Sequence, residues 1–180
     1  MKWMIASDIH GSALYCRQML ARFEAEKADR LLLLGDILYH GPRNDLPAEY
    51  DPKAVIAMLN PLAARILCVR GNCEAEVDQM VLSFPVMADY AVLDLEKCLL
   101  YATHGHRFNG QNPPPLAPGD ILLQGHTHIP CCEPCGDFIC MNPGSVGIPK
   151  EGSRHGYMTL ENGTFLWKDM EGTEVMKYCL

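Results

Sequence analysis

Leu31-Leu32-Leu33-Leu34-Gly35-Asp36 is the stretch that decides the fold, because four consecutive leucines run directly into a glycine and an acid. A short continuous apolar run of this kind is typical of a parallel strand covered on both faces. Helical patterns flank it: Ser12 can cap a helix that runs to about Ala28, and Asp51-Pro52 can begin another. With strand patterns at residues 2–7 and 65–69, the first half of the sequence predicts neighbouring strands joined by right-handed helical crossovers.

The second half of the sequence has a different character, because short strand patterns follow one another with turn signals between them. The clearest signal is Asn162-Gly163, a pair favoured in two-residue hairpin turns. Residues 109–119 are rich in proline and glycine and predict a surface loop. We therefore expect an α/β fold of two packed sheets with helices outside. The strands expected in this half span residues 90–95, 98–103, 120–124, 138–141, 157–160 and 164–167.

Composition limits the class of protein. A chain of 180 residues without repeats or a linker suits a single domain over residues 1–180. The net charge of −7 argues against general nucleic-acid binding, but not against a small phosphorylated substrate. No apolar run is long enough for a membrane span. The odd number of cysteines and the lack of an export signal predict mostly reduced thiols in a cytoplasmic protein.

Five predicted strands each end in residues of the types that bind metal ions. Such strand ends are the usual position of a site in an open α/β sheet. One Asp-x-His pair alone is more often chance or helix capping, but five clusters in order outweigh that explanation. Carboxylate, imidazole and amide ligands favour Mn²⁺, Fe²⁺ or Zn²⁺, and seven ligands fit two ions that share a carboxylate. The seven candidate metal ligands are Asp8, His10, Asp36, Asn72, His104, His126 and His128.

These clusters, in this order, resemble the calcineurin-like metallophosphoesterases over most of the chain, and most closely the small bacterial YfcE-type phosphodiesterases. The stretches Gly35–Asn44, Arg70–Cys73, Glu76–Met80 and Asn142–Val146 carry the closer resemblance. It implies two packed mixed β-sheets flanked by helices, as a four-layer αββα sandwich. It also implies two divalent ions, with Mn²⁺ as first choice and Ni²⁺ as a further alternative, and a homodimer or larger homo-oligomer.

The resemblance assigns the ligands as well. Asp8, His10 and His128 hold the first ion, Asn72, His104 and His126 hold the second, and Asp36 bridges them. Water shared by two cations has its pKa lowered towards neutrality and can attack phosphorus in line. The candidate catalytic residues are Asp36, Asn72, Cys73 and His104, and the candidate substrate-binding residues are His40, Arg43 and Asn72.

Cys73 departs from the wider superfamily, where histidine commonly follows the asparagine and protonates the leaving alkoxide. A thiol with a pKa of about 8.5 transfers protons less well near neutrality than imidazole does. We therefore expect hydrolysis of a small phosphodiester, with a phosphomonoesterase or nucleotidase as the alternative within the class. A non-catalytic scaffold, a role that proteins of this fold also serve, is the alternative outside it.

Other polar residues have two explanations each. Arg43 can clamp phosphoryl oxygens or pair with Asp45 or Glu49. His106 can point into the site or support a ligand from behind, and Asn142 and Ser145 are expected to shape a turn near the metals. A third metal at the cysteines between Cys131 and Cys140 is not expected, because no second pair of ligands follows.

Overall fold

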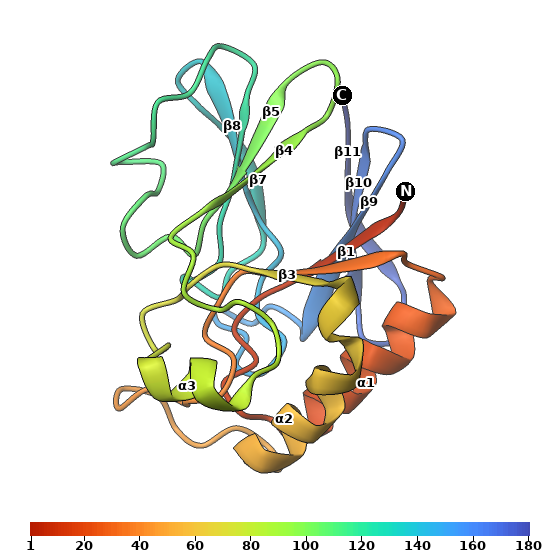
Figure 1. Ribbon diagram of the computed structural model, residues 1–180. Coiled ribbons are helices and arrows are strands. Elements are labelled where there is room, and N and C mark those ends of the chain that lie inside the picture. The colour runs from red at the N-terminus through yellow and green to blue at the C-terminus, as the bar shows by residue number, and fades with distance from the viewer.

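The computed structural model covers residues 1–180 and contains two mixed β-sheets (Figure 1). The six-stranded sheet has the order β11-β10-β9-β1-β2-β3. Its first three strands in the chain are parallel, as predicted, and the last three are antiparallel. These strands are β1 (Trp3–Ala6), β2 (Arg30–Leu33), β3 (Ile66–Cys68), β9 (Gly156–Glu161), β10 (Thr164–Asp169) and β11 (Glu174–Cys179).

The five-stranded sheet has the order β4-β5-β6-β8-β7. Its three central strands, β5, β6 and β8, are parallel, and each edge strand is antiparallel to its neighbour. The sheet is therefore mixed, as the first one is. Its strands are β4 (Ala91–Asp94), β5 (Leu99–Ala102), β6 (Ile121–Leu123), β7 (Cys131–Cys135) and β8 (Phe138–Asn142).

The run of four leucines is explained by two separate cores. Leu31 and Leu33 pack in a cluster with Cys16, Met19 and Phe23 of the first helix. Leu32 and Leu34 belong to a second cluster that fills the space between the sheets. Because alternate residues of a strand face opposite sides, both faces of β2 are buried and all four positions are apolar.

The helices begin where the sequence predicts. Ser12 Oγ accepts from the backbone N–H of Tyr15 at 3.3 Å and caps α1 (Ala13–Ala25). Asp51 caps α2 (Pro52–Leu59) in the same way, through the N–H of Ala54 at 3.0 Å. A 3₁₀ helix, η1 (Asn60–Arg65), follows, and a short helix that was not predicted, α3 (Glu76–Val81), lies further along.

The prediction of two packed mixed sheets is confirmed, but α1 and α2 cover one sheet only, so the second outer helix layer of the expected αββα sandwich is replaced by irregular chain. All helices come from residues 13–81, and α1 and α2 cover the outer face of the six-stranded sheet (Figure 1). Over the five-stranded sheet lies part of the irregular segment 103–120, where a Cβ added to Gly110 would lie 3.0 Å from Cys140 Sγ and 3.1 Å from Cys135 Sγ. None of the helices has the length and apolar character to cross a membrane. That residues 1–180 form one domain stays a prediction.

Candidate metal centre

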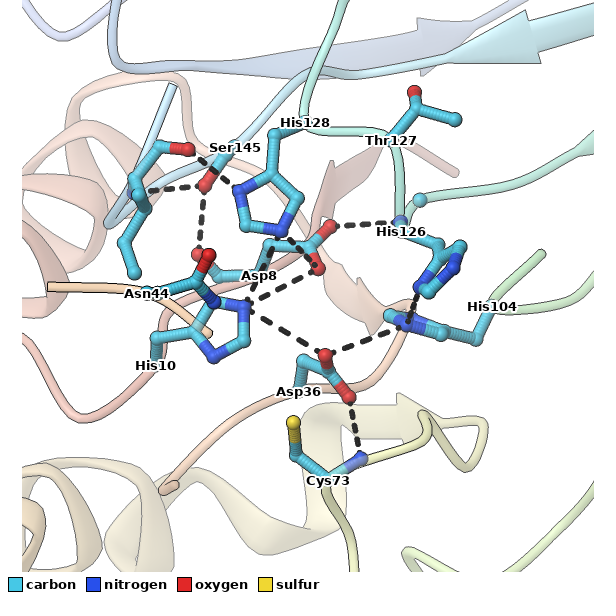
Figure 2. Close-up of polar contacts among 12 residues, drawn as sticks. Asp8, His10, Asp36, Asn44, Cys73, His104, His126, Thr127, His128 and Ser145 are labelled. Atoms are coloured by element: carbon cyan, nitrogen blue, oxygen red, sulfur yellow. Dashed lines mark hydrogen bonds and ion pairs between the residues drawn. The ribbon is translucent and has the colours of Figure 1, made fainter. Parts of the chain in front are cut away.

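The carboxyl ends of parallel strands from both sheets meet at one place. β1, β2 and β3 contribute the loops of one side, and β5 and β6 contribute those of the other. In Figure 2 the side chains of Asp8, His10, Asp36, His104 and His128 point towards a common centre, with His126 beside them. The structure thus brings together the five predicted clusters. The seven candidate ligands that lie together here are Asp8, His10, Asp36, Asn72, His104, His126 and His128.

Five of these candidate ligands have a left-handed backbone conformation, which residues other than glycine rarely adopt. In sequence order the φ angles of Asp8, His10, Asp36, His126 and His128 are 57°, 51°, 55°, 66° and 64°. Each such residue costs roughly 1–3 kcal/mol, and strain of this kind collects at functional sites. These residues therefore lie in tight turns after the strands and not in extended backbone. The turns still direct the side chains to one centre.

The first group of ligands consists of Asp8, His10 and His128, and all three are buried. Asp8 Oδ1 lies 3.6 Å from His10 Nε2 and 3.3 Å from His128 Nε2. The two Nε2 atoms are 3.4 Å apart. Three donor atoms thus face one small space.

The second group consists of Asp36, His104 and His126, with Asn72 beside them. His104 Nε2 lies 3.5 Å from Asp36 Oδ2, 3.1 Å from Asn72 Oδ1 and 3.2 Å from His126 Nδ1. Asp36 Oδ2 is also 3.6 Å from His10 Nε2 of the first group. One carboxylate oxygen therefore lies between the two groups.

Backbone carbonyls fix the orientation of three of the imidazoles. The carbonyl oxygens of Tyr39, Leu34 and Ile148 lie 2.7, 2.6 and 2.5 Å from Nδ1 of His10, His104 and His128, respectively. A carbonyl can only accept, so each Nδ1 carries a proton and donates it, and in the neutral ring the Nε2 lone pair faces the centre. Histidines that bind metals are commonly held in this way.

The arrangement of donors fits bound cations. Asp8 Oδ1 is buried and has no hydrogen-bond donor. The lone pairs of His10 and His128 face each other across 3.4 Å, which is unfavourable for two neutral rings unless a positive species lies between them. A divalent cation satisfies the carboxylate and both nitrogens together. The residues present therefore suit a metal ion, and the second group has the same types of donor.

Residues 1–164 match the family described as the calcineurin-like phosphoesterase superfamily domain. The chain belongs to this family. Phosphodiesterase YfcE of Escherichia coli K12 is 48% identical over 162 residues, which cover 90% of this chain and 88% of the relative. A solved structure of YfcE, described as a phosphoesterase from E. coli, superposes with a TM-score of 0.95, covers 99% of both chains and is 43% identical. The chain is therefore a hydrolase of phosphoric esters.

More distant relatives share the fold. The probable metallophosphoesterase YsnB of Bacillus subtilis is 26% identical over 186 residues, covering 97% of this chain and 95% of the relative. The structure of Vps29 from Entamoeba histolytica in complex with zinc has a TM-score of 0.60 at 17% identity, and covers 99% of both chains. At that identity the likeness concerns the fold alone.

The charges of the phosphoesterase centre are strongly coupled. Burial opposes the charge of Asp36, but His104 outweighs burial and holds the pKa of this carboxyl well below its usual range. Burial likewise disfavours a charged His104, yet Asp36 and Asp8 raise its pKa to about 9. In the chain without metal, the proton on His104 thus balances the negative charge of Asp36, as a bound cation would. A metal ion that binds to His104 must displace this proton.

Glu74 is a positioning residue that the sequence did not identify. It is almost fully buried, and its Oε2 accepts from the backbone N–H groups of Asp36 at 2.9 Å and Gly71 at 2.5 Å. Its Oε1 accepts from the N–H of Ile37 at 2.7 Å. The two loops touch so closely that a Cβ on Gly71 would collide with Asp36 Oδ1. The only signal in the sequence is the acid that follows Cys73.

A cavity of about 480 Å³ opens over the metal ligands, and eleven of its twelve lining residues are polar or small. Arg43 lines it, and the alternative ion pairs are not formed, because Glu49 contacts Arg17 at 3.4 Å instead. His40 does not line the cavity. Its ring packs against Tyr39 and Tyr50, so its contact with substrate stays a prediction that this position does not favour. Lining residues that the sequence did not identify include Asn44, Thr127 and Lys150.

Asn142 and Ser145 shape the turns around the centre, as predicted. Asn142 Nδ2 donates to the carbonyl of Gly125 at 2.8 Å, and Ser145 Oγ donates to the carbonyl of Asp8 at 2.8 Å. His106 lies beside two of the candidate ligands and does not line the cavity: its ring centre is 5.4 Å from that of His104 and 6.3 Å from that of His126. Burial and the charges of its neighbours lower the pKa of His106 to about 4.

All nine cysteines are free thiols.

Proposed function

We propose that the chain hydrolyses small phosphodiesters with two divalent metal ions bound by the seven ligands. The observation that carries the proposal is the position of Asp36, whose Oδ2 lies 3.6 Å from His10 Nε2 and 3.5 Å from His104 Nε2. A carboxylate shared by two groups of ligands is what a two-metal hydrolase needs. Two such ions, when bound, lower the pKa of a water between them and neutralise charge on the phosphoryl oxygens.

In this proposal Asp8, His10 and His128 bind the first ion, Asn72, His104 and His126 bind the second, and Asp36 bridges them. Two of the three groups of neighbouring donors, Asp8-His10-His128 and Asp36-His104-His126, support this division, and the third, His10-Asp36-Cys73, overlaps both. Mn²⁺ is our first choice, because oxygen and imidazole ligands together suit it, and Fe²⁺, Zn²⁺ and Ni²⁺ are alternatives.

The substrate contacts come from residues of the chain itself. Arg43 lines the cavity with no carboxylate partner, so its guanidinium is available for the two unesterified oxygens of the reacting phosphate. Asn72 also lines the cavity, and its amide donates to the Cys73 thiol at 3.3 Å. Because a thiol replaces imidazole at position 73, esters with good leaving groups are favoured. The E. coli relative that is named a phosphodiesterase supports diesters over monoesters.

We also propose a cytoplasmic location and assembly into a homodimer or larger homo-oligomer.

The net charge of −7 supports a small substrate rather than a nucleic-acid polymer.

A metal-supplemented assay tests the proposed reaction. With Mn²⁺ present we expect bis-p-nitrophenyl phosphate to be hydrolysed faster than p-nitrophenyl phosphate, and a chelator to abolish both reactions. Faster hydrolysis of the monoester would favour a phosphomonoesterase. If neither ester reacts while two metal ions per chain are bound, the non-catalytic scaffold replaces the enzyme.

A further inference from the structure

Lys150 is a cation of the metal cavity that the reaction proposed above does not use. It lines the same cavity as the metal ligands, yet it has no carboxylate within 4.0 Å and its ammonium makes no hydrogen bond. Some other cations of the chain have an acidic partner, such as Arg107 with Asp89 at 2.8 Å, whereas others, such as the exposed Lys53, have none. What sets Lys150 and Arg43 apart is that they line the cavity over the candidate metal ligands.

The backbone of Lys150 is tied to the metal centre. Its N–H donates to the carbonyl of His128 at 3.4 Å. Its own carbonyl accepts from the backbone N–H of Ser153 at 3.0 Å and from Ser153 Oγ at 2.6 Å. In the same segment the carbonyl of Ile148 holds the imidazole of His128. Lys150 is therefore carried by a hydrogen-bonded turn with a defined position beside one ligand.

Charge balance shows that Lys150 is not needed for the reacting phosphate. Two divalent ions would exceed the charges of Asp8 and Asp36 by two, and a hydroxide and a phosphodiester, with one negative charge each, would balance that excess without Lys150. Arg43 adds a further positive charge in the same cavity. A second unpaired cation here is repelled by the metals and by Arg43, and an additional anion removes that repulsion.

We propose that Lys150 binds a second phosphate of the substrate, so that the natural substrate is a phosphodiester whose alcohol part carries a further phosphate group. The proposal rests on the proposed function and names its substrate class. The cavity of about 480 Å³ has the size of sites that hold nucleotide-sized molecules. Its mostly polar lining suits a doubly phosphorylated, sugar-like alcohol better than an apolar one.

The proposed role of Lys150 can be tested by ligand binding, without hydrolysis. Calorimetry on the Mn²⁺-loaded protein compares the affinities for thymidine 3′,5′-bisphosphate and thymidine 5′-phosphate. We expect the bisphosphate to bind about tenfold tighter, the size of one charge-assisted contact. Lys150→Met should remove that preference and Lys150→Arg should keep it. Arg43→Met should weaken both ligands by similar factors, because Arg43 contacts the phosphate common to them.

Lys53→Met is the matched control, because Lys53 is an exposed lysine without an acidic partner and lies outside the cavity. This variant should bind both ligands as the wild type does. Equal affinity of the wild-type protein for the two ligands would overturn the proposal. An equal loss for both ligands in Lys150→Met would also overturn it, because Lys150 would then act on the reacting phosphate.

Hydrolysis of matched esters separates this proposal from the proposed function. The p-nitrophenyl ester of thymidine 5′-phosphate is compared with the same ester carrying a 3′-phosphate. We expect a higher kcat/KM for the second ester, and Lys150→Met should remove the difference. If neither ester reacts, the proposed function fails, and the calorimetric preference still decides the role of Lys150. If both react at the same kcat/KM, the second phosphate site is refuted.

Discussion

Cys73 is the residue at which the choice between diesters and monoesters can be tested. Its backbone N–H donates to Asp36 Oδ1 at 2.9 Å, and it lines the metal cavity. Burial and the charge of Asp36 raise the pKa of its thiol above the ordinary value. We expect Cys73→His to raise the ratio of monoester to diester hydrolysis by about tenfold, because imidazole can protonate a poor leaving group. Steady-state rates on the two p-nitrophenyl esters measure this ratio. Cys73→Ser, which provides no imidazole, is the comparison, and an unchanged ratio in Cys73→His would show that position 73 does not set the choice.

Asp36 is the residue on which the two-ion assignment depends. Replacement by asparagine keeps the size of the side chain and removes the charge that both groups of ligands face. We expect Asp36→Asn to lower kcat by at least about 100-fold and to reduce the bound metal below two ions per chain. Rates and elemental analysis after gel filtration give the two values. Asp45→Asn, an exposed acid nearby in the chain, should keep both. Full activity of Asp36→Asn with two ions bound would refute the bridging role.

At the scale of residues, the sequence predicts the ligands but not what holds them. A ligand such as Asp8 is visible because its residue type, its place after an apolar run and its partner His10 are all local. Glu74 acts on Asp36 and Ile37, which are 38 and 37 residues away, so no local pattern marks it. The left-handed backbone of the ligands is hidden for the same reason, because neighbouring loops impose it.

At the scale of elements, the sequence missed α3, β7 and β11, as well as the 3₁₀ helix η1 that continues α2. α3 has Val77, Met80 and Val81 at helical spacing, but it is only six residues long and contains no buried residue, so the pattern is too short to identify a helix. β11 is an edge strand without a fully buried residue. β7 contains Pro134, which has no N–H to donate and argues against a strand, yet it is tolerated because β7 lies at the edge of its sheet. The hairpin at Asn162-Gly163 was predictable because an Asn-Gly pair by itself favours a two-residue hairpin turn.

Glu26 joins the end of α1 to the six-stranded sheet. Its carboxylate accepts hydrogen bonds from Lys2 Nζ, Lys168 Nζ and the Tyr157 hydroxyl, each at 2.9 Å. Burial opposes its charge, but these partners lower its pKa to about 2 from 4.5. We expect Glu26→Gln to reduce the free energy of unfolding at pH 7 by about 2 kcal/mol.

The pH dependence of that loss has a defined sign. Because the pKa of Glu26 is lower in the folded chain than in the unfolded chain, its contribution is complete above pH 5 and declines as pH falls towards 2. Urea unfolding of Glu26→Gln and the wild type at pH 7 and pH 3.5 should therefore give a smaller difference at the lower pH. Glu24→Gln is the control, since that side chain is 69% exposed. A difference independent of pH would contradict the carboxylate's role.

At the scale of the whole molecule, the site lies where two sheets meet. This position explains why the sequence predicts only part of the arrangement of the clusters. The order of the clusters along the chain predicts that the first three share a sheet edge, because parallel neighbouring strands end together. It does not predict how the second sheet is placed. That placement follows from the packed apolar layer between the sheets, in which Ile5 and Leu32 belong to one cluster with Leu123 and Met141.

Metal binding between the two sheets should stabilise the entire fold, because Asp8 and Asp36 follow strands of one sheet and His104 and His126 follow strands of the other. Ions at 100 times their Kd add about 2.7 kcal/mol of stability, or roughly 5–10 °C in Tm for a chain of this size. Burial lowers but the two carboxylates raise the pKa of His104, to about 9, so its proton must leave when metal binds. The rise in Tm caused by Mn²⁺ should therefore be larger at pH 8.5 than at pH 6.5, and a chelator should reverse it. Thermal unfolding with and without Mn²⁺ measures this, and Asp36→Asn should lose most of the rise. A rise of the same size at both pH values, or one that survives in Asp36→Asn, would show that the ions bind somewhere other than between the two sheets.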